Sequence, residues 1–75
     1  MRPEAIQGRA DRIRLKRKDL ARLAGLSQMT IGRTLNGDTS PILSTLDRIE
    51  EALVAEEISL RDYLLSLHPR REEAA

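Results

Sequence analysis

The chain has 75 residues, a formal net charge of +1 at pH 7, and no cysteine, phenylalanine or tryptophan. This length suits one small domain with a single hydrophobic core, and the lack of cysteine excludes a disulfide framework and a cysteine-ligated zinc site. Tyr63 is the only aromatic residue, so the core has to be built from Leu, Ile, Val and Ala, a composition that favours helices over strands.

The first predicted helix covers residues 3–14. Within it Ile6, Ala10 and Ile13 recur at i, i+4 and i+7 and so form one apolar face. Lys16 then stands where the next helix would be expected to have a Ser, Thr or Asp cap. Because a cation at a helix N-terminus opposes the macrodipole, its presence indicates a use for positive charge there, such as contact with phosphate.

Residues 17–36 carry the most informative pattern, which predicts two short helices joined by a tight turn. Gly25 follows the first helix and can take the left-handed conformation that other residues resist. Ser27 is placed to cap the second helix by accepting a backbone N–H. Helices this short have to pack on each other, and at a steep angle they form the helix-turn-helix of DNA-binding proteins. Their inward faces hold Leu20, Ala21, Ala24, Ile31 and Leu35.

A fourth helix is predicted to open at Pro41, with Ser40 as its cap. Its apolar stripe is Ile42, Leu46, Ile49 and Leu53. A fifth helix is predicted over residues 59–68, because Ser59 and Asp62 resemble a capping box. Together these elements predict a compact all-α bundle of five short helices.

We expect residues 1–69 to form one domain and residues 70–75, which have nothing to bury, to be a disordered tail. The fifth helix follows a four-helix core that is already complete, so its apolar stripe is the expected dimer interface; closing the core of the monomer is the alternative. The predicted interface residues are Leu60, Tyr63, Leu64 and Leu67.

Charge is distributed unevenly along the chain. Residues 1–40 contain nine basic and four acidic residues, a balance of +5, whereas residues 41–75 have a balance of −4. This asymmetry indicates a side that faces a polyanion, although a solvated basic face is the alternative. Because the basic half contains the helix-turn-helix pattern, we favour DNA as the polyanion.

The motif resembles the helix-turn-helix of the Cro/CI-type (XRE) regulators, a family with lambda-repressor-like DNA-binding domains. The matching positions are Ala21, Gly25, Ile31, Asn36 and Gly37. It is also similar to the headpiece of the lac-repressor family, through Lys-Asp-Leu-Ala at residues 18–21 and the Ser-x-x-Thr-Ile-x-Arg pattern of residues 27–33. A helix is predicted before the motif and no ligand-binding domain is expected after it, so we prefer the Cro/CI-type resemblance.

The outward residues of the second motif helix, residues 27–36, are expected to enter the major groove. There Gln28 can pair with adenine and Arg33 with guanine, while Met29 suits a thymine methyl group. Taken singly, each could be an ordinary exposed residue. The predicted base-reading residues are Gln28, Met29, Thr30 and Arg33, and the predicted phosphate contacts are Lys16, Arg17, Lys18, Ser27, Asn36 and Thr39.

Three residues depart from the family pattern. Arg17 stands where Cro/CI-type proteins often have a phosphate-binding Gln, and it adds positive charge. Thr34 stands where the family usually buries an aliphatic residue, so a buried hydroxyl would need a carbonyl partner or would cost roughly 1–3 kcal/mol. Gly32 lies in the middle of the second motif helix, where glycine lowers helix stability. Close approach of the backbone to DNA and simple tolerance of this cost explain it equally well.

No catalytic site is expected. His68 is the only histidine and has neither a serine–acid nor a metal-ligand partnership in the sequence. The predicted protein is not an enzyme and needs no metal or cofactor.

We expect the protein to be a transcriptional regulator, and we favour a repressor. It is expected to bind a palindromic operator as a homodimer, with half-sites about 34 Å apart. The sequence has no membrane-spanning apolar run and no signal peptide, so we expect it in the cytoplasm, on bacterial or phage DNA. The alternative is an antitoxin or other partner-binding module whose acidic C-terminal half binds a protein; a toxin or polymerase partner stays open.

Overall fold

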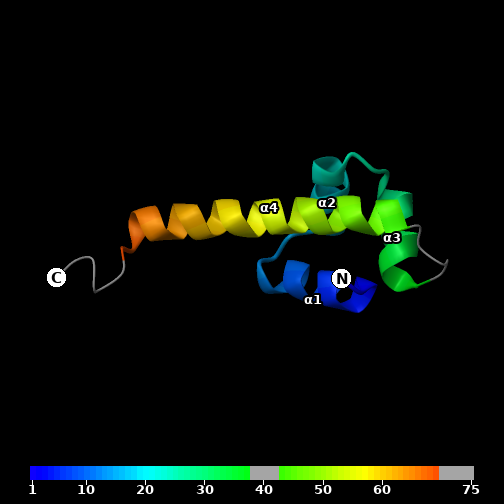
Figure 1. Cartoon of the computed structure of the whole chain (residues 1–75), viewed down its shortest axis with the longest axis horizontal. Coiled ribbons are helices and arrows are strands. Elements are labelled where there is room, and N and C mark those ends of the chain that lie inside the picture. The colour runs from blue at the N-terminus through cyan, green and yellow to red at the C-terminus, as the bar shows by residue number, and fades with distance from the viewer. Residues whose placement is uncertain (38–42, 70–75) are drawn as a thin grey trace.

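A computed structural model describes residues 1–37 and 43–69 of the chain. In those residues it contains four α-helices and no strand (Figure 1). The helices are α1 (Pro3–Arg12), α2 (Arg17–Ala24), α3 (Gln28–Asn36) and α4 (Leu43–Leu67). The predicted all-α class is confirmed.

The predicted count of five helices is wrong, because the segments expected to form a fourth and a fifth helix belong to the single 25-residue helix α4. Residues 54–58 contain neither glycine nor proline, so nothing interrupts the helix there. Ser59 and Asp62 therefore lie inside α4 and form no cap. The expected start of the fourth helix at Ser40 and Pro41, and the tail over residues 70–75, lie outside the described residues.

Local signals set the ends of the first three helices. The first helix ends at Arg12, earlier than predicted, and Arg14 takes a φ of 57°, which an α-helix cannot contain. Gly25 and Gly37 both adopt the left-handed conformation, with φ of 70° and 76°, directly after α2 and α3. The Ser27 hydroxyl accepts a hydrogen bond from the Thr30 N–H at 3.1 Å, so the predicted cap of α3 is confirmed.

The core is aliphatic, as the composition requires, and all four helices contribute to it. Its buried members are Ile6, Ala10, Leu20, Ala21, Ile31, Leu35, Ile49 and Leu53. Thr34 is also buried, and within the described residues no buried side-chain nitrogen or oxygen lacks a hydrogen-bond partner. The hydroxyl at this position is therefore accommodated without an unsatisfied buried group.

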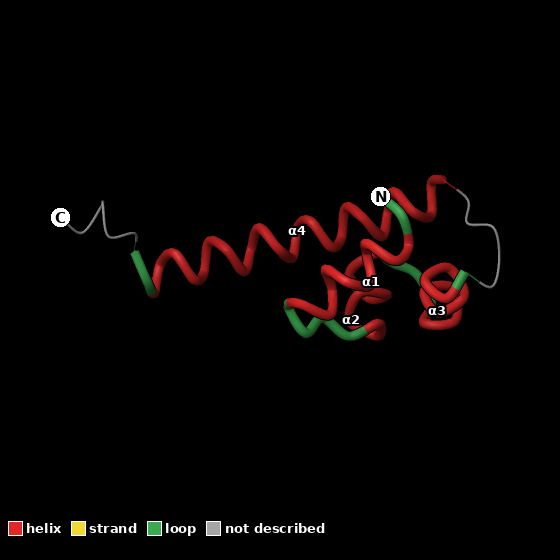
Figure 2. The backbone as a smooth tube through the Cα atoms, turned by 90° about the horizontal axis from the view of Figure 1, so that it is seen from below, coloured by secondary structure: helices red, strands yellow, loops and turns green. Residues whose placement is uncertain are grey.

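The molecule has two structurally different regions. The body consists of α1, α2, α3 and residues 43–57 of α4, and the arm consists of residues 58–67 of α4. Figures 1 and 2 show α1, α2 and α3 gathered at one end of α4, with the arm extending beyond them. At 1.5 Å per residue α4 is about 37 Å long, too long to be covered by helices of eight to ten residues.

Polar contacts hold α4 against α2 and α1. Arg48 donates from Nη2 to the carbonyl oxygens of Ala24 and Gly25, at 3.0 and 3.1 Å, and so binds the C-terminal end of α2. On the other side, Arg9 of α1 forms a two-point ion pair with Glu57, whose hydrogen bond and negative charge raise the pKa of the guanidinium.

Candidate nucleic-acid interface

The turn between α2 and α3 is closed by backbone hydrogen bonds and packed against the core. The N–H groups of Gly25 and Leu26 donate to the carbonyls of Arg22 and Ala21, at 3.2 and 2.9 Å. Leu26 is half-buried against the core cluster. These contacts fix the direction in which the chain enters α3, and thereby orient its outward face.

The two faces of α3 differ sharply. Ile31, Thr34 and Leu35 are buried, whereas Gln28, Met29 and Arg33 are exposed, Met29 by 65%. Thr30 is partly buried, and its Oγ1 accepts a hydrogen bond from the Ser27 hydroxyl at 2.9 Å. Its own hydroxyl hydrogen is left to donate. Gln28, Met29 and Arg33 thus lie on the face of α3 that is turned away from the core, while Thr30 is only partly exposed.

The predicted phosphate-contacting residues are placed in different environments. Lys16 and Lys18 are exposed at the start of α2, and Ser27 is exposed with its hydroxyl engaged in the cap of α3. Arg17 is half-buried and donates to Asn36 at the end of α3 through Nη2, at 2.8 Å. Thr39 lies outside the described residues. Among the described members, Arg17 and Asn36 are therefore in direct contact, whereas Lys16, Lys18 and Ser27 are placed only by their exposure at the starts of α2 and α3.

The matching family model is described as helix-turn-helix, and it covers residues 9–53, from the second half of α1 to the middle of α4. The chain belongs to this XRE-type helix-turn-helix family. It is a DNA-binding regulator of that family, and the predicted resemblance to the Cro/CI-type (XRE) regulators is confirmed. Searches of curated proteins and of solved structures gave no match.

Two residues of this XRE-type regulator that the sequence pattern did not single out hold the motif in place. Arg48 binds the end of α2 next to Gly25, where a Cβ would lie 2.9 Å from Arg48 Nη2. Gln7 of α1 accepts from Arg17 Nε at 2.8 Å. Both contacts join residues distant in sequence, and neither side chain carries a local signal that distinguishes it from an ordinary exposed helix residue.

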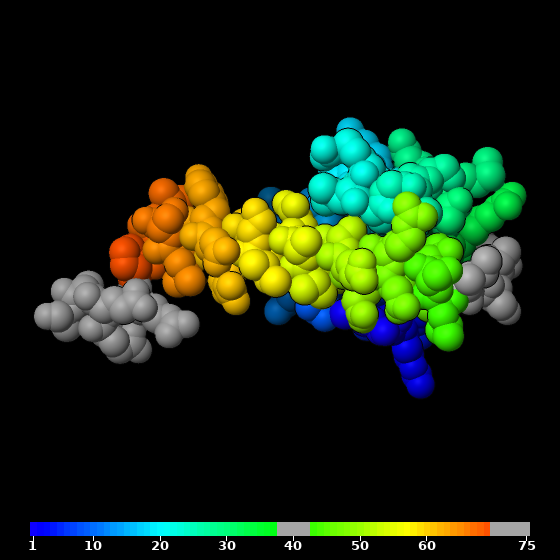
Figure 3. All heavy atoms as spheres, turned by 45° about the horizontal axis from the view of Figure 1, so that its top comes forward, coloured from blue at the N-terminus to red at the C-terminus, as the bar shows by residue number. Residues whose placement is uncertain are grey.

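The arm carries the residues predicted to form a dimer interface. Leu60 is partly buried, while Tyr63, Leu64 and Leu67 are exposed by 60%, 45% and 53%. In the space-filling view the arm stands clear of the body (Figure 3). The XRE-type regulator thus has an unpacked apolar surface remote along α4 from the helix-turn-helix.

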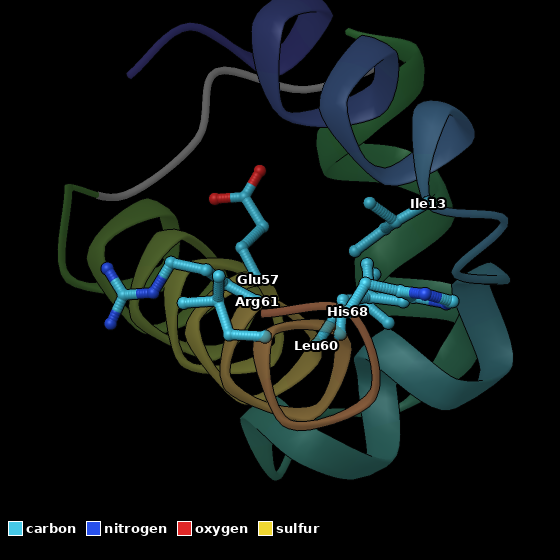
Figure 4. A pocket seen from close by; sticks show the side chains of 7 residues that line it. Ile13, Glu57, Leu60, Arg61 and His68 are labelled. Atoms are coloured by element: carbon cyan, nitrogen blue, oxygen red, sulfur yellow. The ribbon is translucent and has the colours of Figure 1, made fainter. Parts of the chain in front are cut away.

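An open groove of about 380 Å³ lies where the arm leaves the body. Leu60 and Leu64 line it together with Leu65 and with Ile13 from the end of α1, whereas Tyr63 and Leu67 lie outside it (Figure 4). The structure therefore brings together two of the four predicted interface residues and adds two that were not predicted. His68 also lines the groove.

The part of the chain that the structure describes contains neither a metal-binding cluster nor a membrane-spanning helix. There, no group of three or more His, Cys, Asp or Glu side chains could hold a metal ion. No helix within the same residues is long and apolar enough to cross a membrane.

Proposed function

We propose that this regulator binds a palindromic operator as a homodimer, inserts α3 into the major groove and represses transcription. The observation that carries the proposal is the exposed face of α3, on which Gln28, Met29 and Arg33 are available to base edges. We further propose that residues 1–69 act as one DNA-binding unit.

The arm supports the dimeric part of this proposal. Ile49 and Leu53, which are completely buried in the body, belong to an apolar stripe that continues along α4 through Leu60, Leu64 and Leu67. These residues are successively four, seven, four and three residues apart, which keeps them on one side of the helix. The stripe goes on past the last helix that could cover it. Contiguous exposed apolar surface of this kind marks an interaction site, and a second arm is the partner that two-fold operator binding needs.

Selection of bound duplexes from a random DNA library tests the operator proposal. We expect a two-fold symmetric consensus, and Arg33→Ala should weaken binding to it by about 1–3 kcal/mol because a two-point contact with guanine is lost. Arg12→Ala is the matched control, since Arg12 is exposed, carries the same charge and makes none of the contacts described above. Failure to enrich any sequence would contradict operator binding.

Sedimentation of the Tyr63→Asp, Leu67→Asp double variant tests the dimer. We expect the wild-type chain to sediment as a dimer and the variant as a monomer, because buried carboxylates without partners are strongly unfavourable. Ile58→Asp is the control: Ile58 is 44% exposed and lies nine residues from Leu67, on the opposite side of α4. A variant that remained dimeric would refute the proposed interface.

The partner-binding alternative is favoured by one observation, the acidic groups beside the same apolar surface. Glu57 lines the groove and is paired with Arg9, and Asp62 lies on the arm with its carboxylate 3.2 Å from Arg61, which also lines the groove. A basic partner would have to replace these two arginines. If the wild-type chain sediments as a monomer and selects no duplex, we would assign the arm to a basic protein partner instead.

A further inference from the structure

A chain of hydrogen bonds links three helices, α1, α2 and α3, the last of which is the proposed recognition helix. Arg17, the first residue of α2, donates from Nε to Gln7 of α1 and from Nη2 to Asn36 of α3, each at 2.8 Å. Gln7 in turn donates from Nε2 to Asp11 at 2.7 Å. One guanidinium thus joins the two helices of the motif to the helix that precedes them.

The donor and acceptor chemistry of this chain leaves only one orientation for each amide. A guanidinium can only donate, so both amides turn their oxygens toward Arg17. The NH₂ group of Gln7 then meets the carboxylate of Asp11, which can accept. The NH₂ group of Asn36 is left as the outer end of the chain, where it can only donate.

Arg17 keeps donors of its own. Of its five N–H groups, one on Nε and one on Nη2 are used, and the remaining three have no acceptor among the described residues. Nη1 lies over α3, where it would be 4.0 Å from a Cβ added at Gly32. The free donors of Arg17 and the NH₂ group of Asn36 therefore stand side by side next to the exposed face of α3.

Arg17 and Asn36 are both among the predicted phosphate contacts. We propose that Gln7 is a positioning residue, which holds Arg17 beside Asn36 so that the two side chains bind the same DNA backbone phosphate. A phosphodiester only accepts hydrogen bonds, which matches this all-donor pair. The C-terminal end of α3 carries negative dipole charge that repels an anion, so the fixed guanidinium is needed there. This inference rests on the proposed function, because the phosphate belongs to the operator.

A double-mutant cycle tests the coupling. Gln7→Met keeps the length of the side chain but removes both hydrogen bonds, and we expect operator affinity to fall about three- to tenfold. Arg17→Met should weaken binding further and reduce the slope of log affinity against log salt by about 0.9, the value for one lost phosphate contact. In the Arg17→Met background, Gln7→Met should change nothing more.

Two controls separate positioning from folding. Ala5→Met places the same side chain on an exposed position of α1, and it should leave operator affinity unchanged. Operators with single methylphosphonate linkages locate the phosphate: one neutral linkage should weaken wild-type binding but not binding by Arg17→Met. This second measurement compares duplexes on one protein, so it is independent of any change in stability.

The outcomes separate the two proposals. A wild-type chain that binds no duplex would overturn both of them. If the wild type binds its operator but Gln7→Met binds equally well, or loses the same factor with Arg17 absent, the operator proposal stands and the positioning role of Gln7 is refuted. A methylphosphonate scan without an Arg17-dependent position would refute the shared phosphate site.

Discussion

The body and the arm contain the same apolar stripe of α4 in opposite environments. In the body, Ile49 and Leu53 are fully buried under three short helices, while in the arm Leu64 and Leu67 are about half exposed. Stability should therefore depend on the stripe residues of the body, and association on those of the arm. Comparing matched substitutions in the two regions tests this division.

The largest difference is expected between Leu53→Ala and Leu64→Ala. Leu53 is fully enclosed, so its truncation leaves a cavity and should lower the free energy of unfolding by about 2–5 kcal/mol. Leu64 is 45% exposed and leaves little cavity, so we expect a loss below about 1 kcal/mol. Urea unfolding at protein concentrations too low for association measures both. Equal losses would mean that the arm packs on the body.

A second pair compares arginines along α4. Arg48→Met removes two charge-assisted hydrogen bonds to the end of α2 and should lower the free energy of unfolding by about 1 kcal/mol. Arg61→Met is its counterpart on the arm. Within the described residues Arg61 pairs only with the neighbouring Asp62, so the free energy of unfolding should hardly change. A null result for Arg48→Met would show that packing alone holds the turn.

The features that the sequence predicted are local, whereas those that it did not predict join residues far apart in the chain. Gly25, Ser27 and Gly37 act within a few residues of their own position, and their roles at helix ends follow from local conformation. Arg48 reaches a carbonyl 24 residues away and Arg9 a carboxylate 48 residues away. No local pattern encodes such contacts, because they depend on how the helices pack.

The sequence predicted a break between two helices where the structure has the continuous helix α4, and this error also comes from relying on a local signal. Ser59 with Asp62 imitates the start of a helix, but a capping signal matters only where the backbone N–H groups lack partners. Since residues 54–58 contain no breaker, the preceding turn already satisfies those groups. The outward face of α3 was easier to predict, because a single helix period decides which of its residues face the core.

A third prediction uses the glycine content of the two regions. The helix α4 contains no glycine and can extend into solvent, whereas α3 contains Gly32 and depends on the body. An added Cβ at Gly32 would make an ordinary contact at 4.0 Å, so Gly32→Ala should raise the free energy of unfolding by up to about 1 kcal/mol. Gly8→Ala, with open space around it, is the stability control.

Operator binding by Gly32→Ala then decides between the two explanations of this glycine. If the α3 backbone approaches DNA closely, the variant gains stability but loses affinity, while Gly8→Ala gains stability alone. Unchanged affinity in both variants would establish simple tolerance at Gly32.

The smallest effect is expected where the body meets the arm, at the ion pair between Arg9 and Glu57. The Arg9 side chain is 47% exposed, so water and salt screen the pair, and Glu57→Gln should lower the midpoint of thermal unfolding only slightly. Glu56→Gln is the matched control, because the adjacent carboxylate is also partly buried but has no recorded ion pair in the described residues. In about 1 M salt, where the Debye length falls to about 3 Å, the two variants should unfold alike. A difference that survives high salt would mean that Glu57 acts through packing, and would place the boundary of the body farther along α4.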